Sequence, residues 1–207
     1  DTKYFLDKIL AGDISNRKIA VLGARTGEII KQYWDGFCQA EEITLFDTSA
    51  GILKLAQEKL GGMNANIRYC STYNEGVEES ELNKYDIVLA VNLLHTYEEP
   101  LKEVEWAALL LKREGDFYAI EYEELDPMGI LISGLLENGF VNRKRGRREH
   151  TPLLLLDDWK NIYGQAPFGE VAINRRGRLG ALLIHAKNVT PEVIEMRSRI
   201  LEYMNEN

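Results

Sequence analysis

The sequence has little cysteine and no long hydrophobic run, and both shortages restrict what this protein can be. Its two cysteines, Cys38 and Cys70, form neither a CxxC pair nor part of a cysteine and histidine cluster suited to a metal. We therefore expect both thiols to be structural and the compartment to be a reducing one, such as the cytoplasm. Apolar runs such as Leu153–Leu156 are far shorter than the roughly 20 residues of a membrane helix. Since no signal peptide opens the chain, we expect no membrane partner.

Positive charge is the scarcer sign, because 25 lysines and arginines face 33 aspartates and glutamates, for a net charge of −8. This balance disfavours broad binding to nucleic acid or to an acidic membrane. The positive charge is nevertheless clustered, and such clusters fit either solvated loops or a local docking surface for an acidic or phosphorylated partner. The two clusters are Arg143, Lys144, Arg145, Arg147 and Arg148, and Arg175, Arg176 and Arg178.

Length and hydrophobic content are ample for one domain. A chain of 207 residues, 45% of them hydrophobic, can bury roughly 70% of its unfolded surface without a disulfide or a metal. The chain begins at Asp1 rather than at a methionine, which leads us to expect a segment of a longer polypeptide.

Strand-like and helical segments alternate down to about residue 140. Short connections between them predict right-handed βαβ units, with a parallel sheet and helices on both of its faces. The predicted strands are Lys18–Leu22, Ile43–Phe46, Ile67–Cys70, Tyr85–Val91 and Asp116–Glu121. The predicted helices are Thr2–Leu10, Gly27–Trp34, Ala50–Leu60, Leu101–Leu111 and Gly129–Asn138.

The last third has a different pattern. A helix is predicted over Asp157–Tyr163, and a closing helix from Thr190 to about Tyr203. Between them, Glu170–Ile173 and Ala181–Ala186 flank a turn-rich segment, so we expect an antiparallel hairpin. The predicted fold class is therefore α/β, with a Rossmann-like seven-stranded sheet that is mostly parallel and ends in a C-terminal antiparallel hairpin.

A glycine turn, Gly23–Gly27, follows the first predicted strand. Ligands of such sheets bind at the carboxyl ends of the strands, where glycine permits tight turns and a helix N-terminus offers N–H groups. Asp47 follows the second strand, twenty residues after Gly27, and its carboxylate can accept hydrogen bonds from both hydroxyls of a ribose. The alternative is an ordinary strand–helix turn with a helix-capping aspartate.

The segment from Lys18 to about Lys187 resembles the class I methyltransferase domains embedded in polyketide synthases and non-ribosomal peptide synthetases. The stretches that carry the resemblance are IAVLGARTGEI, ITLFDTSAGILKLAQEKL, YDIVLAVNLLHTYEEPLKEVEWAALLLKREGDFYAIE and LLLLDDWKNIYG. The strand, Asn, two apolar residues and His in YDIVLAVNLLHT are the most specific of these features, followed by the strand that ends in Glu in GDFYAIE.

The resemblance implies S-adenosylmethionine as the cofactor. It implies contacts with the cofactor from Gly23, Ala24, Arg25, Gly27, Asp47, Thr48, Ser71, Thr72 and Asn92. This chain departs from the family at three positions, since members usually carry an acid at the position of Val21, glycine at that of Arg25 and an acid near Ser71. The long side chain at Arg25 could point away from the cofactor or pair with its carboxylate.

His95 follows the fourth predicted strand and Glu121 ends the fifth, so the two side chains are expected to meet at the edge of the sheet. A histidine suits the role of general base, and a carboxylate on its far nitrogen fixes the tautomer and stabilises the imidazolium. The resemblance gives this pair the task of removing a proton next to a carbonyl before carbon methylation. The alternative for His95 is a structural histidine at a strand end. His150 is read as a loop residue and His185 as a strand residue, neither in a comparable setting.

The resemblance also implies a substrate and partners. The substrate would be a β-carbonyl acyl chain held by phosphopantetheine on an acyl or peptidyl carrier protein, with other synthase domains flanking this one. The basic cluster within Val141–Leu156 could meet the phosphate or the acidic surface of that carrier. The acidic stretch of Tyr122, Glu123, Glu124 and Asp126 reads as a solvated loop on the substrate side.

Three functions remain open on these grounds. The first is a C-methyltransferase; the second is a pseudo-methyltransferase that is structural or exchanges an α-proton as an epimerase would; the third is a free-standing methyltransferase of small molecules. In each case we expect one domain over 1–207. Its parts are a leading helix in 1–17, a cofactor-binding core in 18–140, a substrate-side cover in 141–167, and the hairpin and closing helix in 168–207.

Overall fold

The computed structural model describes residues 1–63, 66–71, 78–125, 153–193 and 195–197. The helices are α1 (Thr2–Leu10), α2 (Glu28–Gln32), α3 (Trp34–Phe37), α4 (Ala50–Leu60), α5 (Pro100–Leu110) and α7 (Leu156–Gln165). The strands are β1 (Lys18–Leu22), β2 (Glu42–Phe46), β3 (Ile67–Cys70), β4 (Tyr85–Val91), β5 (Leu111–Tyr122), β6 (Phe168–Arg176) and β7 (Ala181–Val189). Thr72, the first basic cluster, the predicted helix Gly129–Asn138, the acidic residue Asp126 and much of the predicted cover lie outside the described residues.

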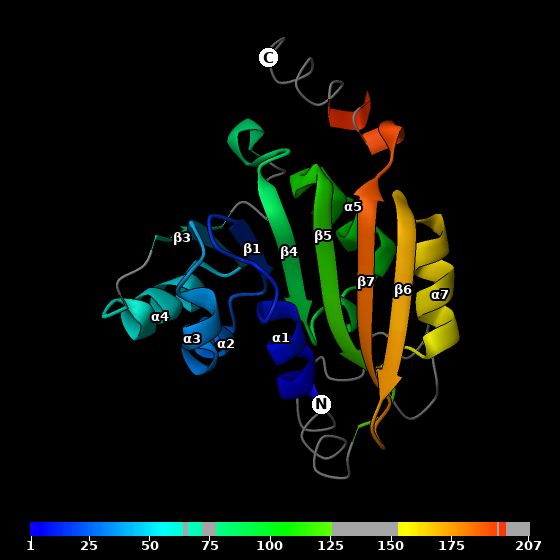
Figure 1. Ribbon diagram of the computed structural model, residues 1–207, viewed down its shortest axis with the longest axis horizontal. Coiled ribbons are helices and arrows are strands. Elements are labelled where there is room, and N and C mark those ends of the chain that lie inside the picture. The colour runs from blue at the N-terminus through cyan, green and yellow to red at the C-terminus, as the bar shows by residue number, and fades with distance from the viewer. Residues whose placement is uncertain (64–65, 72–77, 126–152, 194, 198–207) are drawn as a thin grey trace.

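The seven strands form one sheet in the order β3-β2-β1-β4-β5-β7-β6 (Figure 1). Strands β1 to β5 run parallel, whereas β7 is antiparallel to both β5 and β6. The predicted fold class, a mostly parallel sheet with a C-terminal antiparallel hairpin, is confirmed. The order reverses between β1 and β4, so the crevice at the carboxyl ends of these two strands is the switch point of the sheet.

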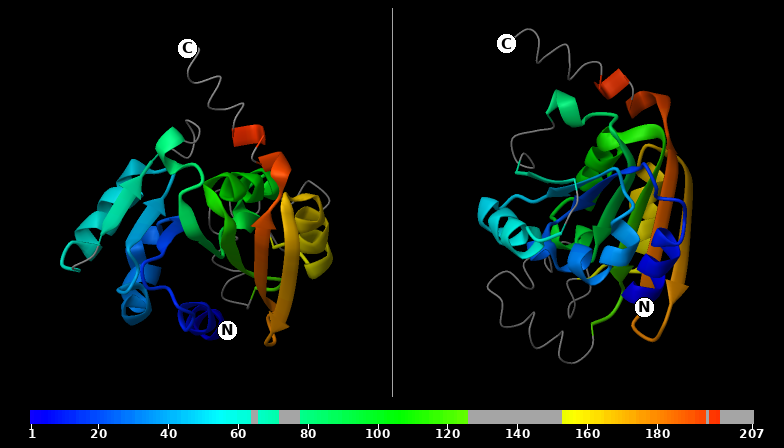
Figure 2. Two further views of the ribbon diagram at one scale, coloured as in Figure 1. Left: turned by 45° about the horizontal axis from the view of Figure 1, so that its top comes forward. Right: turned by 60° about the vertical axis from the view of Figure 1, so that its left-hand side comes forward.

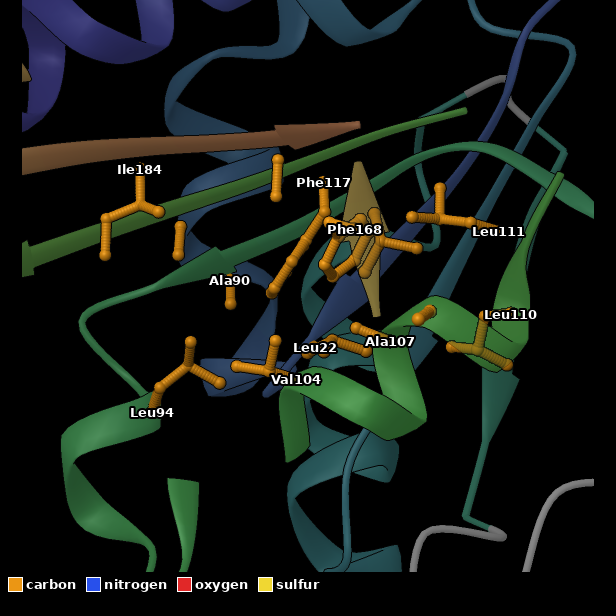
Figure 3. Packing of buried hydrophobic residues seen from close by; sticks show 14 of the residues in the cluster. Leu22, Ala90, Leu94, Val104, Ala107, Leu110, Leu111, Phe117, Phe168 and Ile184 are labelled. Carbon is orange, nitrogen blue, oxygen red and sulfur yellow. The ribbon is translucent and has the colours of Figure 1, made fainter. Parts of the chain in front are cut away.

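Helices pack on both faces of the sheet (Figures 1 and 2) because successive strand residues point to opposite sides. One apolar cluster joins alternate residues of the central strands, such as Ile19 and Leu89, to α1, α2, α3 and α4. The other joins the intervening residues, such as Leu22 and Ala90, to α5 (Figure 3). It also includes residues of α7. Strand β4 is buried along almost all its length, as its continuous apolar run predicts.

The predicted helix Gly27–Trp34 is divided in the structure. A short 3₁₀ turn, Arg25–Gly27, precedes α2, and Tyr33 separates α2 from α3. Gly27 has φ of 74°, a left-handed conformation that an α-helix does not contain, so the regular helix begins only at Glu28. Apolar periodicity alone did not indicate this break.

Two predicted regions of strand are longer than expected. Strand β5 begins at Leu111, directly after α5, although its regular pairing with β4 starts only at Asp116 after an irregularity. The hairpin strands extend to Phe168–Arg176 and Ala181–Val189, because the antiparallel pairing continues beyond the apolar residues from which the strands were predicted. Only helical turns at 191–193 and 195–197 represent the closing helix among the described residues.

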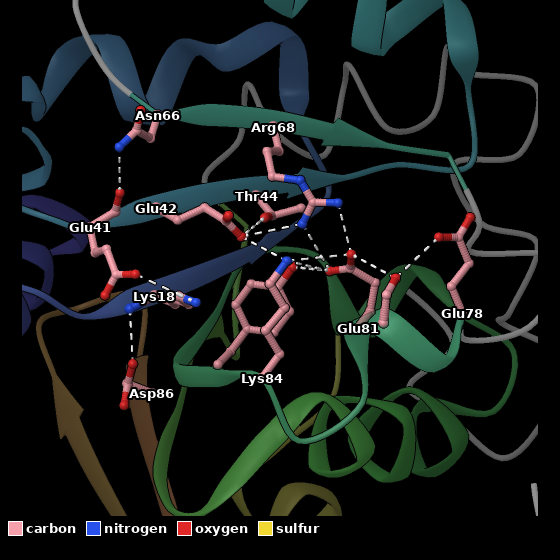
Figure 4. Close-up of polar contacts among 12 residues, drawn as sticks. Lys18, Glu41, Glu42, Thr44, Asn66, Arg68, Glu78, Glu81, Lys84 and Asp86 are labelled. Carbon is pink, nitrogen blue, oxygen red and sulfur yellow. Dashed lines mark hydrogen bonds and ion pairs between the residues drawn. The ribbon is translucent and has the colours of Figure 1, made fainter. Parts of the chain in front are cut away.

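A polar network ties the amino ends of β2, β3 and β4 together (Figure 4). At its centre the Glu81 carboxylate, only 1% exposed, accepts hydrogen bonds from Arg68 at 2.9 Å and from Lys84 and Tyr85. Burial alone raises the pKa of Glu81, but these donors outweigh burial and hold that pKa below its ordinary value. The network lies at the opposite edge of the sheet from the switch point, so we assign it to stability.

The second basic cluster and the acidic stretch are partly structural. Arg176 contacts the Asp1 carboxylate at 3.1 Å and lies over the Tyr4 ring, which fastens α1 to the hairpin. Glu123 pairs with Arg175 and accepts a hydrogen bond from the Leu156 N–H at 3.1 Å. The interpretation of residues 122–126 as a solvated loop is therefore wrong for Glu123, which is 8% exposed and joins β5, β6 and α7.

Candidate functional site

A histidine and a glutamate meet at the carboxyl edge of the sheet. His95 Nδ1 lies 2.7 Å from Glu121 Oε2, and the glutamate is fully buried while the histidine side chain is 11% exposed. Glu121 is the last residue but one of β5, and His95 lies in the 3₁₀ turn Leu94–Thr96 that follows β4. The structure brings these two predicted residues together as expected, although 26 positions separate them in the sequence.

The backbone holds the glutamate in place. Its Oε1 accepts hydrogen bonds from the N–H groups of Leu93 at 2.9 Å and Leu94 at 2.7 Å. Asn92 has a φ of 49°, and its N–H donates a hydrogen bond of 2.6 Å to the Ile120 carbonyl. The chain therefore turns sharply after β4, and the N–H groups of Leu93 and Leu94 point to the carboxylate. Because a carboxylate only accepts, the hydrogen bond from Nδ1 places the imidazole proton on that nitrogen. A neutral His95 therefore carries its basic lone pair on Nε2.

The two outer glycines of the turn after β1 have different surroundings. Gly23 has φ of 73°, and a Cβ there would lie 2.9 Å from the Leu93 side chain, beside the crevice. A Cβ on Gly27 would lie 2.7 Å from the Leu60 side chain, so this glycine permits close packing against α4. Gly27 is thus explained by packing, and its predicted role in cofactor binding stays a prediction.

Asp47 follows β2 and fastens the glycine turn. Its Oδ2 accepts a hydrogen bond from the Ala24 N–H at 3.0 Å, and its Oδ1 accepts one from the Ser49 N–H at 2.9 Å. Ser49 in turn caps α4 through the Ile52 N–H. Each carboxylate oxygen retains a second lone pair, so the side chain can hold the turn and still accept two ribose hydroxyls.

Arg25 reaches across the switch point. Its Nη2 donates a hydrogen bond of 2.6 Å to the main-chain oxygen of Asn92, so the side chain spans from the end of β1 to the end of β4. Burial lowers the pKa of Arg25, and the nearby charge of Glu121 acts in the opposite direction. The predicted contacts Thr48 and Ser71 are exposed at the ends of β2 and β3, and Thr72 lies outside the described residues.

A second histidine–carboxylate pair escaped the sequence analysis. His185 Nε2 lies 2.7 Å from Asp116 Oδ1, and the ring stacks on Tyr118 with the ring centroids 4.3 Å apart. The statement that His185 has no setting comparable with that of His95 is therefore wrong. The pair lies within the β5–β7 ladder, about 16 Å along the strand from Glu121, because five residues separate Asp116 from it. Only the cross-strand register, which the sequence does not give, would have revealed this pair.

The side chains at the carboxyl ends of the strands differ in what they present to a ligand. At the ends of β2 and β3, Asp47 and the exposed Thr48 and Ser71 carry hydrogen-bonding groups of the kind that a ribose and a base require. At the end of β4, in contrast, the Asn92 carbonyl oxygen already accepts a hydrogen bond from the Arg25 guanidinium. Among the residues that the structure describes, no group of three or more potential metal ligands is present.

Comparison with known proteins shows similarity to methyltransferase domains. Residues 20–119 match the family model described as a methyltransferase domain. Highly reducing polyketide synthase 40 of Fusarium pseudograminearum is 29% identical over 122 residues, which are 58% of this chain and 5% of that protein. The hybrid PKS-NRPS synthetase phm1 of Pyrenochaetopsis sp is 26% identical over 211 residues, which are 95% of this chain and 5% of that protein.

The fold is also that of a solved synthase domain. The structure of the citrinin polyketide synthase CMeT domain has a TM-score of 0.75 and 21% identity, and the match covers 92% of this chain and 52% of that one. The resemblance to methyltransferase domains of synthases is therefore confirmed, and the chain spans about a twentieth of these synthases and about half of the solved domain. Within the described residues, no helix is long and apolar enough to cross a membrane.

Proposed function

We propose that this chain, whose residues 20–119 match a methyltransferase domain, is an S-adenosylmethionine-dependent C-methyltransferase. Its substrate is a β-carbonyl acyl chain tethered to a carrier protein. The observation that carries the proposal is the contact of 2.7 Å between His95 and the buried carboxylate of Glu121 at the carboxyl edge of the sheet. When bound, the cofactor would supply an electrophilic methyl group.

The two side chains divide the proton chemistry. His95 Nε2 takes the proton from the carbon between the two carbonyl groups, which frees the electron pair for a new carbon–carbon bond. The imidazole then carries a positive charge, which the Glu121 carboxylate stabilises through Nδ1. The N–H groups of Leu93 and Leu94 keep Glu121 from turning away during this step. Burial of the carboxylate strengthens its interaction with the imidazolium relative to water.

The length of the relatives suggests that other protein domains surround this chain. The two synthases that match are many times longer than this chain. We propose that flanking synthase domains and a carrier protein deliver the substrate as a phosphopantetheine thioester, and that the division of 1–207 into core, cover and hairpin holds. The basic cluster at 143–148 is the proposed contact for the carrier. Reversing the charges of Arg145 and Arg147 should weaken carrier binding, and unchanged binding would remove this contact from the proposal.

A pseudo-methyltransferase is the second candidate, and Arg25 favours it. A guanidinium that spans the switch point leaves less room for a cofactor, whereas the His95–Glu121 pair stays intact. In that case the pair would remove and return an α-proton without any methyl transfer, as an epimerase does. A purely structural domain would do neither.

One experiment separates the candidates. A β-ketoacyl pantetheine thioester with no α-branch and its α-methyl counterpart, which keeps one α-hydrogen, are incubated in D₂O with and without S-adenosylmethionine. Methyl transfer, which needs the cofactor, identifies a C-methyltransferase; α-hydrogen exchange with no methyl transfer to either substrate identifies an epimerase, and a structural domain matches the uncatalysed rate of exchange. His95→Ala should abolish either activity. His185→Ala is the matched control, because it removes a histidine from a similar carboxylate pair outside the site and should leave turnover unchanged.

A further inference from the structure

The exposed side chain of Arg25 spans two strand ends at the switch point of the sheet. The residue belongs to the turn after β1, and its guanidinium donates to the Asn92 carbonyl after β4. These two strand ends flank the point where the strand order reverses, which is where open α/β sheets bind ligands. The backbone of Arg25 has φ of 41°, a left-handed value that glycine adopts at little cost and arginine does not. The side chain is therefore held at the crevice by a strained residue.

The order of the side chains along the carboxyl ends of the strands indicates which part of a bound cofactor would lie next to the Arg25 guanidinium. On the proposed function, Asp47 after β2 accepts the ribose hydroxyls. The adenine then extends toward Ser71 after β3, and the amino-acid half of the cofactor extends the other way, toward β4. Arg25 crosses the crevice on this second side, and its partner there is the Asn92 carbonyl. With the methyl donor bound in this order, Arg25 would lie beside its sulfonium and its ammonium.

We propose that Arg25 is a specificity-determining residue that occupies the amino-acid half of the methyl-donor site and disfavours a cationic donor. The inference rests on the proposed function and concerns one residue of that site. S-adenosylmethionine carries a sulfonium and an ammonium against one carboxylate, and so has one net positive charge. S-adenosylhomocysteine lacks the sulfonium charge and is neutral overall. A resident guanidinium, although exposed, repels the first more strongly than the second, because bringing like charges together costs binding energy.

Binding is the measurement, because it needs no turnover. Titration calorimetry on the full chain would compare wild type, Arg25→Gly and Arg25→Gln with three ligands: S-adenosylmethionine, S-adenosylhomocysteine and adenosine. Arg25→Gln removes the charge and keeps most of the length, whereas Arg25→Gly removes both and suits the left-handed backbone. The matched control is Arg113→Gln, which removes the same charge from an exposed residue at the start of β5, at the far edge of the sheet.

We expect both Arg25 variants to bind S-adenosylmethionine about tenfold more tightly than wild type, with a smaller gain for S-adenosylhomocysteine. Adenosine has no amino-acid half, so its affinity should change by less than about twofold, and Arg113→Gln should behave as wild type. Equal affinity of wild type and Arg25→Gly for the methyl donor overturns this inference and leaves the proposed function standing. An equal gain in affinity for adenosine also overturns this inference. If neither wild type nor any variant binds any of the three ligands, both this inference and the proposed function are overturned.

Discussion

At the scale of single residues, the site depends on how many hydrogen bonds one carboxylate accepts. Glu121 takes two main-chain N–H groups on one oxygen and His95 on the other. The turn after β4 therefore does two things at once: it supplies the donors that hold the Glu121 carboxylate in place, and it carries the histidine that this carboxylate orients.

Glu121→Gln tests this coupling. The glutamine oxygen can still accept from Leu93 and Leu94, but its amide nitrogen would then face His95 Nδ1 as a donor. That contact moves the imidazole proton to Nε2 and removes the base, so we expect proton abstraction to fall by about 10²- to 10⁴-fold. The rate of α-hydrogen exchange in D₂O measures it. A variant that exchanges at the wild-type rate would show that Glu121 does not control the tautomer.

Asp47 gives a second prediction at this scale. Asp47→Ala leaves the N–H groups of Ala24 and Ser49 without their acceptor, which we expect to lower the free energy of unfolding by about 1–3 kcal/mol. Urea denaturation followed by circular dichroism measures the change. Thr48→Ala is the control, since this neighbouring side chain is exposed and should shift stability by no more than about 0.5 kcal/mol. Equal effects of the two substitutions would mean that Asp47 does not fasten the turn.

At the scale of elements, the contact between the glycine turn and α4 fixes how closely that helix approaches the sheet. Gly27→Ala adds a Cβ 2.7 Å from Leu60 at a residue whose φ is 74°. Left-handed strain and overpacking together should lower the free energy of unfolding by about 2–4 kcal/mol. Shortening the obstructing side chain tests the mechanism, because Leu60→Ala in the same chain should make the cost of Gly27→Ala smaller. Additive losses would exclude a clash.

A glycine in another helix provides the matched control. Gly164 lies in α7, and a Cβ there would have no heavy atom within 4 Å. Gly164→Ala should therefore be neutral or stabilise the protein by up to about 1 kcal/mol, since alanine loses less backbone freedom in a helix. A loss of stability at both glycines would indicate that glycine itself, rather than the contact with Leu60, is what the fold requires.

Elements with a strong apolar pattern were predictable, and those shaped by single contacts were not. Strand β4 and helix α4 were predicted with their observed bounds, because each has a clear period and α4 a capping serine. The predicted helix Gly27–Trp34 was right over Glu28–Gln32 and wrong at its ends, because a left-handed glycine precedes α2 and Tyr33 separates it from α3. The early start of β5 at Leu111 depends on pairing with Tyr85, which lies in another part of the chain.

At the scale of the whole molecule, topology explains why part of the site could be derived from the sequence. Parallel strands end at one edge, so residues that follow them must gather there, as His95 and Glu121 do. The direction of a long side chain is not fixed by this rule. Arg25 could be assigned to the turn from the sequence, but its contact with Asn92 depends on rotamers and on the path of the chain after β4.

The edge of the sheet opposite the site also follows from the parallel arrangement. The amino ends of β2 and β3 and the segment before β4 bring Glu42, Arg68 and Glu81 together, and the buried Glu81 carboxylate is compensated by several donors. Removing one partner from such a cluster is costly because the remaining charges stay buried. The network therefore makes the fold of the whole chain sensitive to the charge of one side chain, and hence to acid.

Glu81→Gln tests that sensitivity. Because the pKa of Glu81 lies below its ordinary value of 4.5 in the folded chain, the unfolded chain binds a proton first as the pH falls. The stabilisation is present above about pH 5 and is lost as the pH falls through the lowered pKa. We expect the free energy of unfolding to fall less steeply below pH 5 in Glu81→Gln than in wild type, although the variant is less stable at pH 7. Glu79→Gln, an exposed residue of the same turn, should keep the wild-type slope, and equal slopes in all three proteins would contradict the role of Glu81.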